Sequence, residues 1–171
     1  MQIIYNTSTL HLEDIPLGVG YASDKVTLKD MNDQPFTIGG QNGHTQLIIS
    51  TPFVDEMLIS QLRQLDELLA LNTFVIGKSL VVATKEHPNP QLSEWNYGYD
   101  YDTQFGDYYG VRLGQGELCG EFAKALFIVS KDGALFYDEI PKDLNEPFSM
   151  EKAIIKIAAA VDCYTGHGCH G

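Results

Sequence analysis

The sequence predicts one α/β domain in which helices flank a sheet of mixed strand direction. Three observations carry this prediction. Short apolar runs typical of strands alternate with two amphipathic helices, turn residues separate several of these runs as in hairpins, and neither a repeat nor a Gly/Ser linker divides the 171 residues. That length suits one domain of roughly 100–200 residues. We expect residues 1–161 to form the domain and residues 162–171 to form a flexible tail.

The N-terminal part of the chain predicts two hairpins. Residues 2–12, QIIYNTSTLHL, contain two β-rich runs around the polar residues 6–8, which is the pattern of a small hairpin at an edge. In residues 25–40, apolar residues alternate with polar ones on both sides of the turn residues 32–33. This second segment is therefore expected to form another pair of strands.

A buried strand and a long helix follow. The run QLIIS at 46–50 is apolar without alternation, which is typical of a central strand buried on both faces. Residues 54–71 repeat apolar side chains at intervals of three and four, and Asp55 and Glu56 suit the positive end of a helix dipole. The predicted apolar stripe of this helix comprises Val54, Met57, Leu58, Leu62, Leu65, Leu68 and Leu69.

The next segment predicts a strand and an extended aromatic stretch. Residues 80–84 are the better strand of the apolar run that follows the helix. Between residues 95 and 101 every second residue is Trp or Tyr, so the aromatic side chains fall on one face. We interpret this stretch as half-buried and packed on a neighbouring element, rather than as an aromatic platform for a ligand.

The last part of the domain predicts a hairpin between two helical segments. Residues 105–111 suit a short helical turn, and residues 125–130 form another continuous apolar strand. The turn 131–133, Lys-Asp-Gly, leads into a partner strand. A final helix is expected at 149–161, with Ser149 as its N-cap.

Composition excludes several classes of function. Eleven basic and 23 acidic residues give a net charge of −12, which repels phosphate backbones and anionic lipids, so we expect neither a nucleic-acid nor a membrane partner. No apolar run reaches the ~18–20 residues of a membrane span, and no signal peptide is recognisable at the start, so we expect a cytoplasmic protein. Three cysteines are too few for a disulfide scaffold.

Several segments in order are similar to the thiol peroxidases, the atypical two-cysteine branch of the peroxiredoxins. The resemblance rests on FGDYYGV at 105–111, AKALFIVSKDGALFYDEIP at 123–141 and EPFSMEKAI at 146–154, and it extends over about residues 2–160. It implies a thioredoxin-like, peroxiredoxin-type fold with an added N-terminal β-hairpin, a thiol-dependent peroxidase activity and a homodimer.

The resemblance also locates the positions of the family's catalytic residues. Peroxiredoxins carry their peroxidatic cysteine in the motif P-x-x-x-T-x-x-C at the start of the helix expected at 54–71, and here Thr51 is kept while Val54 replaces the cysteine. Lys124 stands where the family has an arginine, and Trp95 aligns with the resolving cysteine on the helix that follows the second central strand. We therefore predict a chain that is degenerate at both redox positions, with Asp55 and Lys124 forming a new ion pair.

One other cysteine lies inside the expected domain. Cys119 is a candidate substitute for the missing thiol, but Glu117 and Glu121 flank it, and nearby negative charge disfavours the thiolate. The histidines of the domain, among them His87, are expected in surface or capping positions.

The C-terminal residues VDCYTGHGCHG contain a dense group of metal-ligand types. Cys163, His167, Cys169 and His170 offer two thiolates and two imidazoles, which zinc, copper or nickel ions prefer, although the spacing matches no standard zinc motif. Two alternatives remain open: a reversible disulfide between Cys163 and Cys169, and a tail without a role.

The sequence thus predicts a thiol-peroxidase-like protein that is not a peroxidase and whose tail binds a metal ion. The alternative is a thiol-dependent oxidoreductase or peroxidase that uses Cys163 and Cys169, or Cys119, in place of the family cysteines. No other cofactor is indicated. A third hypothesis is a regulatory protein that keeps only its dimer surface and acidic exterior.

Overall fold

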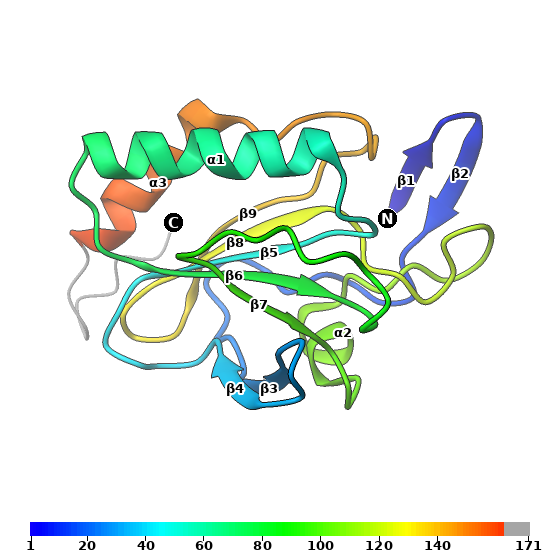
Figure 1. Cartoon of the computed structure of the whole chain (residues 1–171), viewed down its shortest axis with the longest axis horizontal. Coiled ribbons are helices and arrows are strands. Elements are labelled where there is room, and N and C mark those ends of the chain that lie inside the picture. Colours follow the sequence, from blue (N-terminus) through cyan, green and yellow to red (C-terminus); the bar gives the residue numbers. More distant parts are fainter. Residues whose placement is uncertain (163–171) are drawn as a thin grey trace.

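The computed structural model describes residues 1–162 as two sheets and three helices (Figure 1). The strands are β1 (Gln2–Tyr5), β2 (Ser8–His11), β3 (Val26–Lys29), β4 (Pro35–Ile38), β5 (Gln46–Ser50), β6 (Gly77–Val82), β7 (Asn96–Tyr99), β8 (Ala125–Val129) and β9 (Leu135–Glu139). The helices are α1 (Glu56–Leu71), α2 (Gln104–Tyr109) and α3 (Met150–Val161). Strands β1 and β2 form a separate hairpin sheet, and the other seven pair in the order β4-β3-β7-β6-β5-β8-β9.

The main sheet has the mixed strand direction that the sequence predicts. Strand β5 runs parallel to β6 and antiparallel to β8, with Ser50 opposite Ala125 as the last pair before helix α1. Every residue of β5 is buried, because the strand lies near the middle of the sheet and is covered on both faces.

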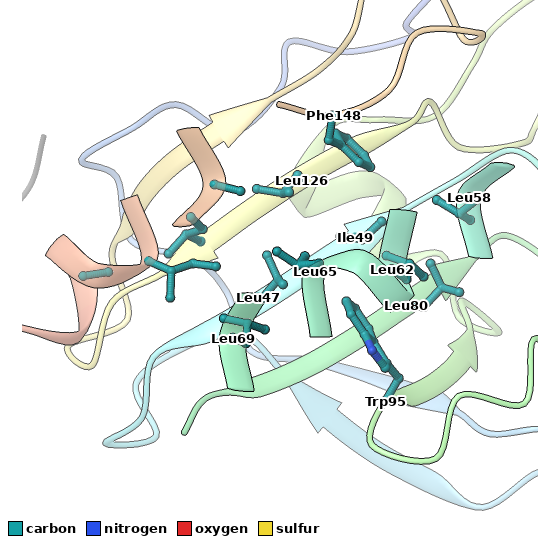
Figure 2. Close-up of a cluster of buried hydrophobic side chains, with 14 of the residues drawn as sticks. Leu47, Ile49, Leu58, Leu62, Leu65, Leu69, Leu80, Trp95, Leu126 and Phe148 are labelled. Atoms are coloured by element: carbon teal, nitrogen blue, oxygen red, sulfur yellow. The ribbon is translucent and has the colours of Figure 1, made fainter. Parts of the chain in front are cut away.

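Alternate residues of the central strands serve the two faces of the sheet. Helices α1 and α3 cover one face, and the short helix α2 lies on the other (Figure 1). Leu47 and Ile49 belong to the cluster beneath α1 and α3, whereas Ile48 belongs to the cluster that includes Phe105 and Tyr109 of α2. Figure 2 shows the first of these clusters, in which leucines of α1 meet the strands.

Helix α1 begins two residues later than the sequence predicts. Asp55 is its N-cap, and the carboxylate oxygen Oδ1 accepts the backbone N–H of Leu58 at 2.9 Å, so Val54 lies outside the helix. The expected stripe is also wrong at Met57, which is 36% exposed. Gln61, one turn further along, is buried instead. The predicted cap of α3 is confirmed, since the Ser149 hydroxyl accepts the N–H of Lys152 at 3.3 Å.

The segment between α1 and β7 differs from expectation in two ways. Strand β6 begins at Gly77 rather than Leu80, because the buried Lys78 finds a partner in Asp66 of α1, Nζ to Oδ1 2.6 Å. In addition, no helix separates β6 from β7 within residues 83–95, which form turns, bends and an irregular stretch. The aromatic stretch is extended as predicted: β7 alternates between half-buried tyrosines and other residues.

The N-terminal hairpin is held to the C-terminal half of the domain. The N–H of Ile4 donates to the Lys142 carbonyl at 2.7 Å, and the N–H of Leu144 donates to the Ile4 carbonyl at 2.9 Å. Ile3 and Leu10 are buried against Leu144 in a third apolar cluster. The hairpin is therefore an integral part of the domain.

No helix among residues 1–162 is both long and apolar enough to cross a membrane.

Candidate functional site

The site indicated by the family motif lies at the ends of two neighbouring strands. Ser50 and Ala125 form the last pair of the β5–β8 ladder, so Thr51 follows β5 at the same edge of the sheet at which Lys124 precedes β8. The N–H of Thr51 also donates to the Val81 carbonyl of β6 at 3.3 Å. The antiparallel register thus brings together Thr51 and Lys124, which are distant in sequence.

Thr51 shapes the loop that leads into α1. Its hydroxyl donates to the Phe53 carbonyl at 2.7 Å and accepts the Phe53 N–H at 3.4 Å. Val54 follows as a half-buried residue just before the N-cap. The Thr51 hydroxyl is therefore engaged by its own loop. The next position of the motif carries the aliphatic side chain of Val54.

Lys124 is a buried amine with a single hydrogen bond among residues 1–162. The residue is 3% exposed, its Nζ donates to the Glu146 carbonyl at 2.7 Å, and it lies 4.9 Å from the centre of the Phe148 ring. Burial lowers the pKa of this amine, because the charged form loses water. The carboxylates of Asp55, Glu139 and Glu146 oppose that change by favouring the charged form.

The prediction of an ion pair between Asp55 and Lys124 is wrong. Neither residue belongs to an ion pair of 4.0 Å or less among residues 1–162. The Asp55 carboxylate instead caps α1, and the Lys124 amine is held by a carbonyl 22 residues further along the chain. The cap satisfies a backbone donor that would otherwise lack a partner, so it competes directly with the pair.

Trp95 is a core residue of this fold. Figure 2 shows its ring pointing into the cluster that contains Leu62, Leu65 and Leu80. The indole Nε1 donates to both carboxylate oxygens of Asp66 at 3.0 Å, and the Lys78 amine lies 5.5 Å from the centre of the ring. Packing in the core and a charge-assisted hydrogen bond thus hold the Trp95 side chain in place.

Cys119 lies on an exposed turn. Its backbone N–H donates to the Gly116 carbonyl at 3.2 Å. Nearby, the carboxylate oxygen Oε2 of Glu121 lies 2.9 Å from Nε2 of His87, and both side chains are largely buried. Sequence reasoning missed this pair, because its partners come from two loops 34 residues apart, where periodicity gives no signal.

The predicted metal ligands Cys163, His167, Cys169 and His170 lie outside the described residues. Within residues 1–162, no group of three or more His, Cys, Asp or Glu side chains is arranged to hold a metal ion.

The chemistry available at the Thr51 edge follows from these contacts. A thiol-dependent redox step needs a thiolate that reaches a substrate, whereas this edge offers an aliphatic side chain, a hydroxyl engaged in its loop and a buried amine. Thr51, Val54 and Lys124 thus supply no thiol at this edge.

Comparisons with known proteins agree with the fold of the chain. A thiol peroxidase of Campylobacter jejuni is 26% identical over 162 residues, which cover 89% of each chain. A thiol peroxidase of Aquifex aeolicus is 23% identical over 158 residues, which cover 89% of this chain and 92% of the relative. The crystal structure of a peroxiredoxin-like protein from Aquifex aeolicus superposes with a TM-score of 0.80 at 20% identity, over 92% of this chain and 95% of the other.

No protein-family model matches the chain. The sequence match and the structural match nevertheless each cover about nine-tenths of this chain. The chain is therefore similar to the thiol peroxidases over most of its length, and it has a thioredoxin-like fold.

Proposed function

We propose that this thiol-peroxidase-like chain does not reduce peroxides by the family's cysteine mechanism. The observation that carries the proposal is Val54, at the position of the peroxidatic cysteine just before α1. Attack on a peroxide needs a thiolate, and an aliphatic side chain cannot supply one. Residues 1–118 contain no cysteine at all, so no residue near position 54 can take the place of the peroxidatic cysteine.

The surroundings of Val54 support the same proposal. Thr51, which would orient a peroxide, donates its hydroxyl proton to the Phe53 carbonyl. Asp55 places a carboxylate beside the site, where it would raise the pKa of a thiol rather than lower it. Lys124 supplies a compact amine engaged by the Glu146 carbonyl, without the fork of donors that an arginine offers.

The remaining chemistry of the chain is proposed to reside in Cys163, His167, Cys169 and His170. Two thiolates and two imidazoles form a ligand set for a zinc, copper or nickel ion, and glycines between them let the backbone bring the ligands together. On this proposal the domain is a scaffold and the C-terminal residues bind the metal.

Peroxide consumption tests the first proposal. We expect the reduced, metal-free wild-type chain to consume hydrogen peroxide no faster per thiol than free cysteine does. Cys119→Ser and the double variant Cys163→Ser/Cys169→Ser identify the source of any faster reaction. Catalytic turnover that disappears in the double variant, or in Cys119→Ser, would overturn the proposal in favour of a thiol-dependent oxidoreductase.

Native mass spectrometry tests the metal proposal. The untagged protein is purified without chelator and without air, and its mass is compared before and after acid denaturation. We expect an excess of one metal ion per chain that is lost on acid treatment. Replacing all four ligands (Cys163→Ser, His167→Asn, Cys169→Ser and His170→Asn) should abolish the excess, whereas Cys119→Ser/His11→Asn/His44→Asn should keep it. A metal-free wild-type chain, or stoichiometric metal in the fourfold variant, would contradict the proposal.

We also propose that the chain forms a homodimer, as its resemblance to thiol peroxidases implies. Light scattering on a size-exclusion column should give twice the 19.0 kDa chain mass over a tenfold range of loading concentration. A mass of one chain throughout that range would exclude a stable dimer.

A further inference from the structure

The main sheet is open between β3 and β7. Strand β7 pairs with β6 at all four of its residues, from Asn96 to Tyr99. On its other side it pairs with β3 at one position, Lys29 with Tyr99. Strand β3 ends at Lys29, so the residues of β7 before Tyr99 have a paired strand on the β6 side only.

A surface pocket of about 470 Å³ lies beyond the end of this ladder. The hairpin contributes Asp30, Asn32 and Phe36 to one wall, and the segment that ends in β7 contributes Ser93, Asn96 and Tyr97 to the other. This volume falls within the ~300–1,000 Å³ of typical ligand pockets. The pocket is separate from the Thr51 edge, since neither Thr51, Val54 nor Lys124 lines it.

The backbone of Tyr97 faces this pocket. The N–H of Asp100 donates to the Val82 carbonyl of β6, so the even-numbered residues of this stretch direct their backbone groups towards β6. The odd-numbered residues Tyr97 and Tyr99 therefore direct theirs towards β3. Tyr99 meets Lys29 there, but among residues 1–162 no backbone pair continues the ladder at Tyr97.

Both walls of the pocket are fixed by contacts outside it. On the hairpin side, the Asp33 carboxylate is bound by the Lys85 amine and the Tyr99 hydroxyl, each at 2.7 Å. On the other side, the Tyr97 hydroxyl donates to the Pro88 carbonyl at 3.1 Å and Trp95 is anchored to Asp66. The opening is thus built into the fold, and a ligand would find it already formed.

The rim of the pocket selects for an uncharged or basic ligand. The side chains of Asn32, Gln91, Ser93 and Asn96 are exposed and have no hydrogen-bond partner among the described residues. Asp30 is the charged residue of the lining, and the chain as a whole carries a charge of −12. Acidic ligands are therefore repelled, while amide-rich ones find donors and acceptors on both walls.

We propose that the opening between β3 and β7 binds an extended peptide segment without acidic residues, whose backbone pairs with Tyr97. An open strand edge offers an N–H and a C=O at the spacing of a peptide, and the neutral side chains on both walls can bind the neighbouring amides. The inference is independent of the proposed loss of peroxidase activity.

The test starts from random short peptides displayed on phage and selected on the whole wild-type chain. We expect enriched peptides that lack Asp and Glu. Their synthetic forms should bind Ser93→Trp and Asn32→Trp, which fill the pocket from opposite walls, at least about tenfold more weakly than they bind the wild type. Ser60→Trp changes an equally exposed serine on α1 outside the pocket and should bind them unchanged.

The hydrogen-exchange rate of the Tyr97 amide distinguishes strand pairing from non-specific adhesion of a peptide to the surface. The amide of Tyr97 should exchange more slowly when a selected peptide is bound, because it then donates to the peptide. The proposal is overturned if no peptide is enriched, if the selected peptides bind both filled variants as tightly as the wild type, or if the exchange of Tyr97 is unchanged by binding. Far-UV circular dichroism of the filled variants confirms that they are folded.

Discussion

The indole nitrogen of Trp95 donates to both carboxylate oxygens of Asp66, at 3.0 Å each. This contact ties the segment before β7 to helix α1, and the Lys78 amine binds the same carboxylate at 2.6 Å. The position that the resemblance assigns to a resolving cysteine therefore contributes to the stability of the domain.

Removing the indole N–H should destabilise the fold measurably. We expect Trp95→Phe to lower the free energy of unfolding by about 1.5–3 kcal/mol, the range for a hydrogen bond to a charged group. Asp66→Asn should cost more, about 3 kcal/mol, since it also weakens the partner of the buried Lys78. Urea unfolding followed by circular dichroism measures both, because Trp95 is the chain's single tryptophan and its fluorescence is lost.

A double-mutant cycle of these two changes isolates their coupling. The double variant should be more stable than the sum of the single effects predicts, because Trp95→Phe removes the hydrogen bond that Asp66→Asn weakens by removing its charge. Asp102→Asn, at an exposed aspartate, serves as the control and should stay within about 0.5 kcal/mol of the wild type. Strict additivity would mean that the contact between Trp95 and Asp66 contributes nothing.

Two strand glycines should respond oppositely to a methyl group. A Cβ at Gly98 would lie 2.5 Å from a ring carbon of Phe36 and 2.8 Å from the Lys29 carbonyl oxygen, so Gly98→Ala should destabilise the fold by about 1–3 kcal/mol. A Cβ at Gly77 would lie 3.8 Å from its nearest neighbour, so Gly77→Ala should be neutral or slightly stabilising. Equal midpoints of thermal unfolding for the two variants would show that the β3–β4 hairpin moves to accommodate the added methyl group without loss of stability.

The buried amine of Lys124 should make stability depend on pH. Its pKa is lowered in the folded chain by burial, so between that lowered pKa and the ordinary value of about 10.5 the unfolded chain binds more protons. Stability contributed at this site therefore rises with pH across that range. Relative to Lys124→Met, the wild type should gain stability between pH 7 and about pH 9.5, by at most ~1.4 kcal/mol per unit of difference in pKa.

Denaturant titrations at several pH values in that range measure this difference. The range stops below the titration of the tyrosines, because burial raises the pKa of Tyr97 to about 12 and its ionisation in the unfolded chain would then lower stability. Lys142→Met controls for removing an exposed amine. A constant difference between the wild type and Lys124→Met at every pH would contradict the prediction.

The charge of Asp55 should lower the reactivity of a thiol introduced at position 54. In a background with Cys119, Cys163 and Cys169 changed to Ser, we compare Val54→Cys with Val54→Cys/Asp55→Ser. Serine keeps an N-cap for Leu58 but removes the negative charge, so the introduced thiol should have a lower pKa in the second variant and react faster with hydrogen peroxide at neutral pH. The pH dependence of alkylation measures the thiol pKa, and coincident profiles would show that the Asp55 charge has no influence.

Elements with a strong local pattern could be predicted from the sequence. Strand β5 and helices α1 and α3 are where periodicity and apolar runs place them, to within two residues. The errors come from partners that are distant in the sequence. Gln61 is buried because its amide oxygen accepts the N–H of Phe148 at 3.0 Å, and Lys78 is buried because Asp66 neutralises it. A helical period reports which residues share a face, but not which polar group finds a partner there.

The contacts of the candidate site could not be predicted from the sequence. The resemblance to a known motif located Thr51 and Lys124, and the β5–β8 register brings them to one edge. Asp55 could serve either as a helix cap or as an ion-pair partner, and the sequence does not rank the two. The opening between β3 and β7 has no sequence signature, because it depends on a strand pair that ends after one position.

The N-terminal hairpin has a consequence for how the chain folds during its synthesis. Its strands are made before the rest of the domain, yet their hydrogen bonds to Lys142 and Leu144 need residues that leave the ribosome some 140 positions later. Until then, Ile3 and Leu10 lack the apolar surface that buries them, and they can be bound by a chaperone. The hairpin, although it precedes the rest of the domain in synthesis, is thus among the last parts to reach its native contacts, so a ribosome stalled before residue 142 would hold a domain whose hairpin is incompletely folded.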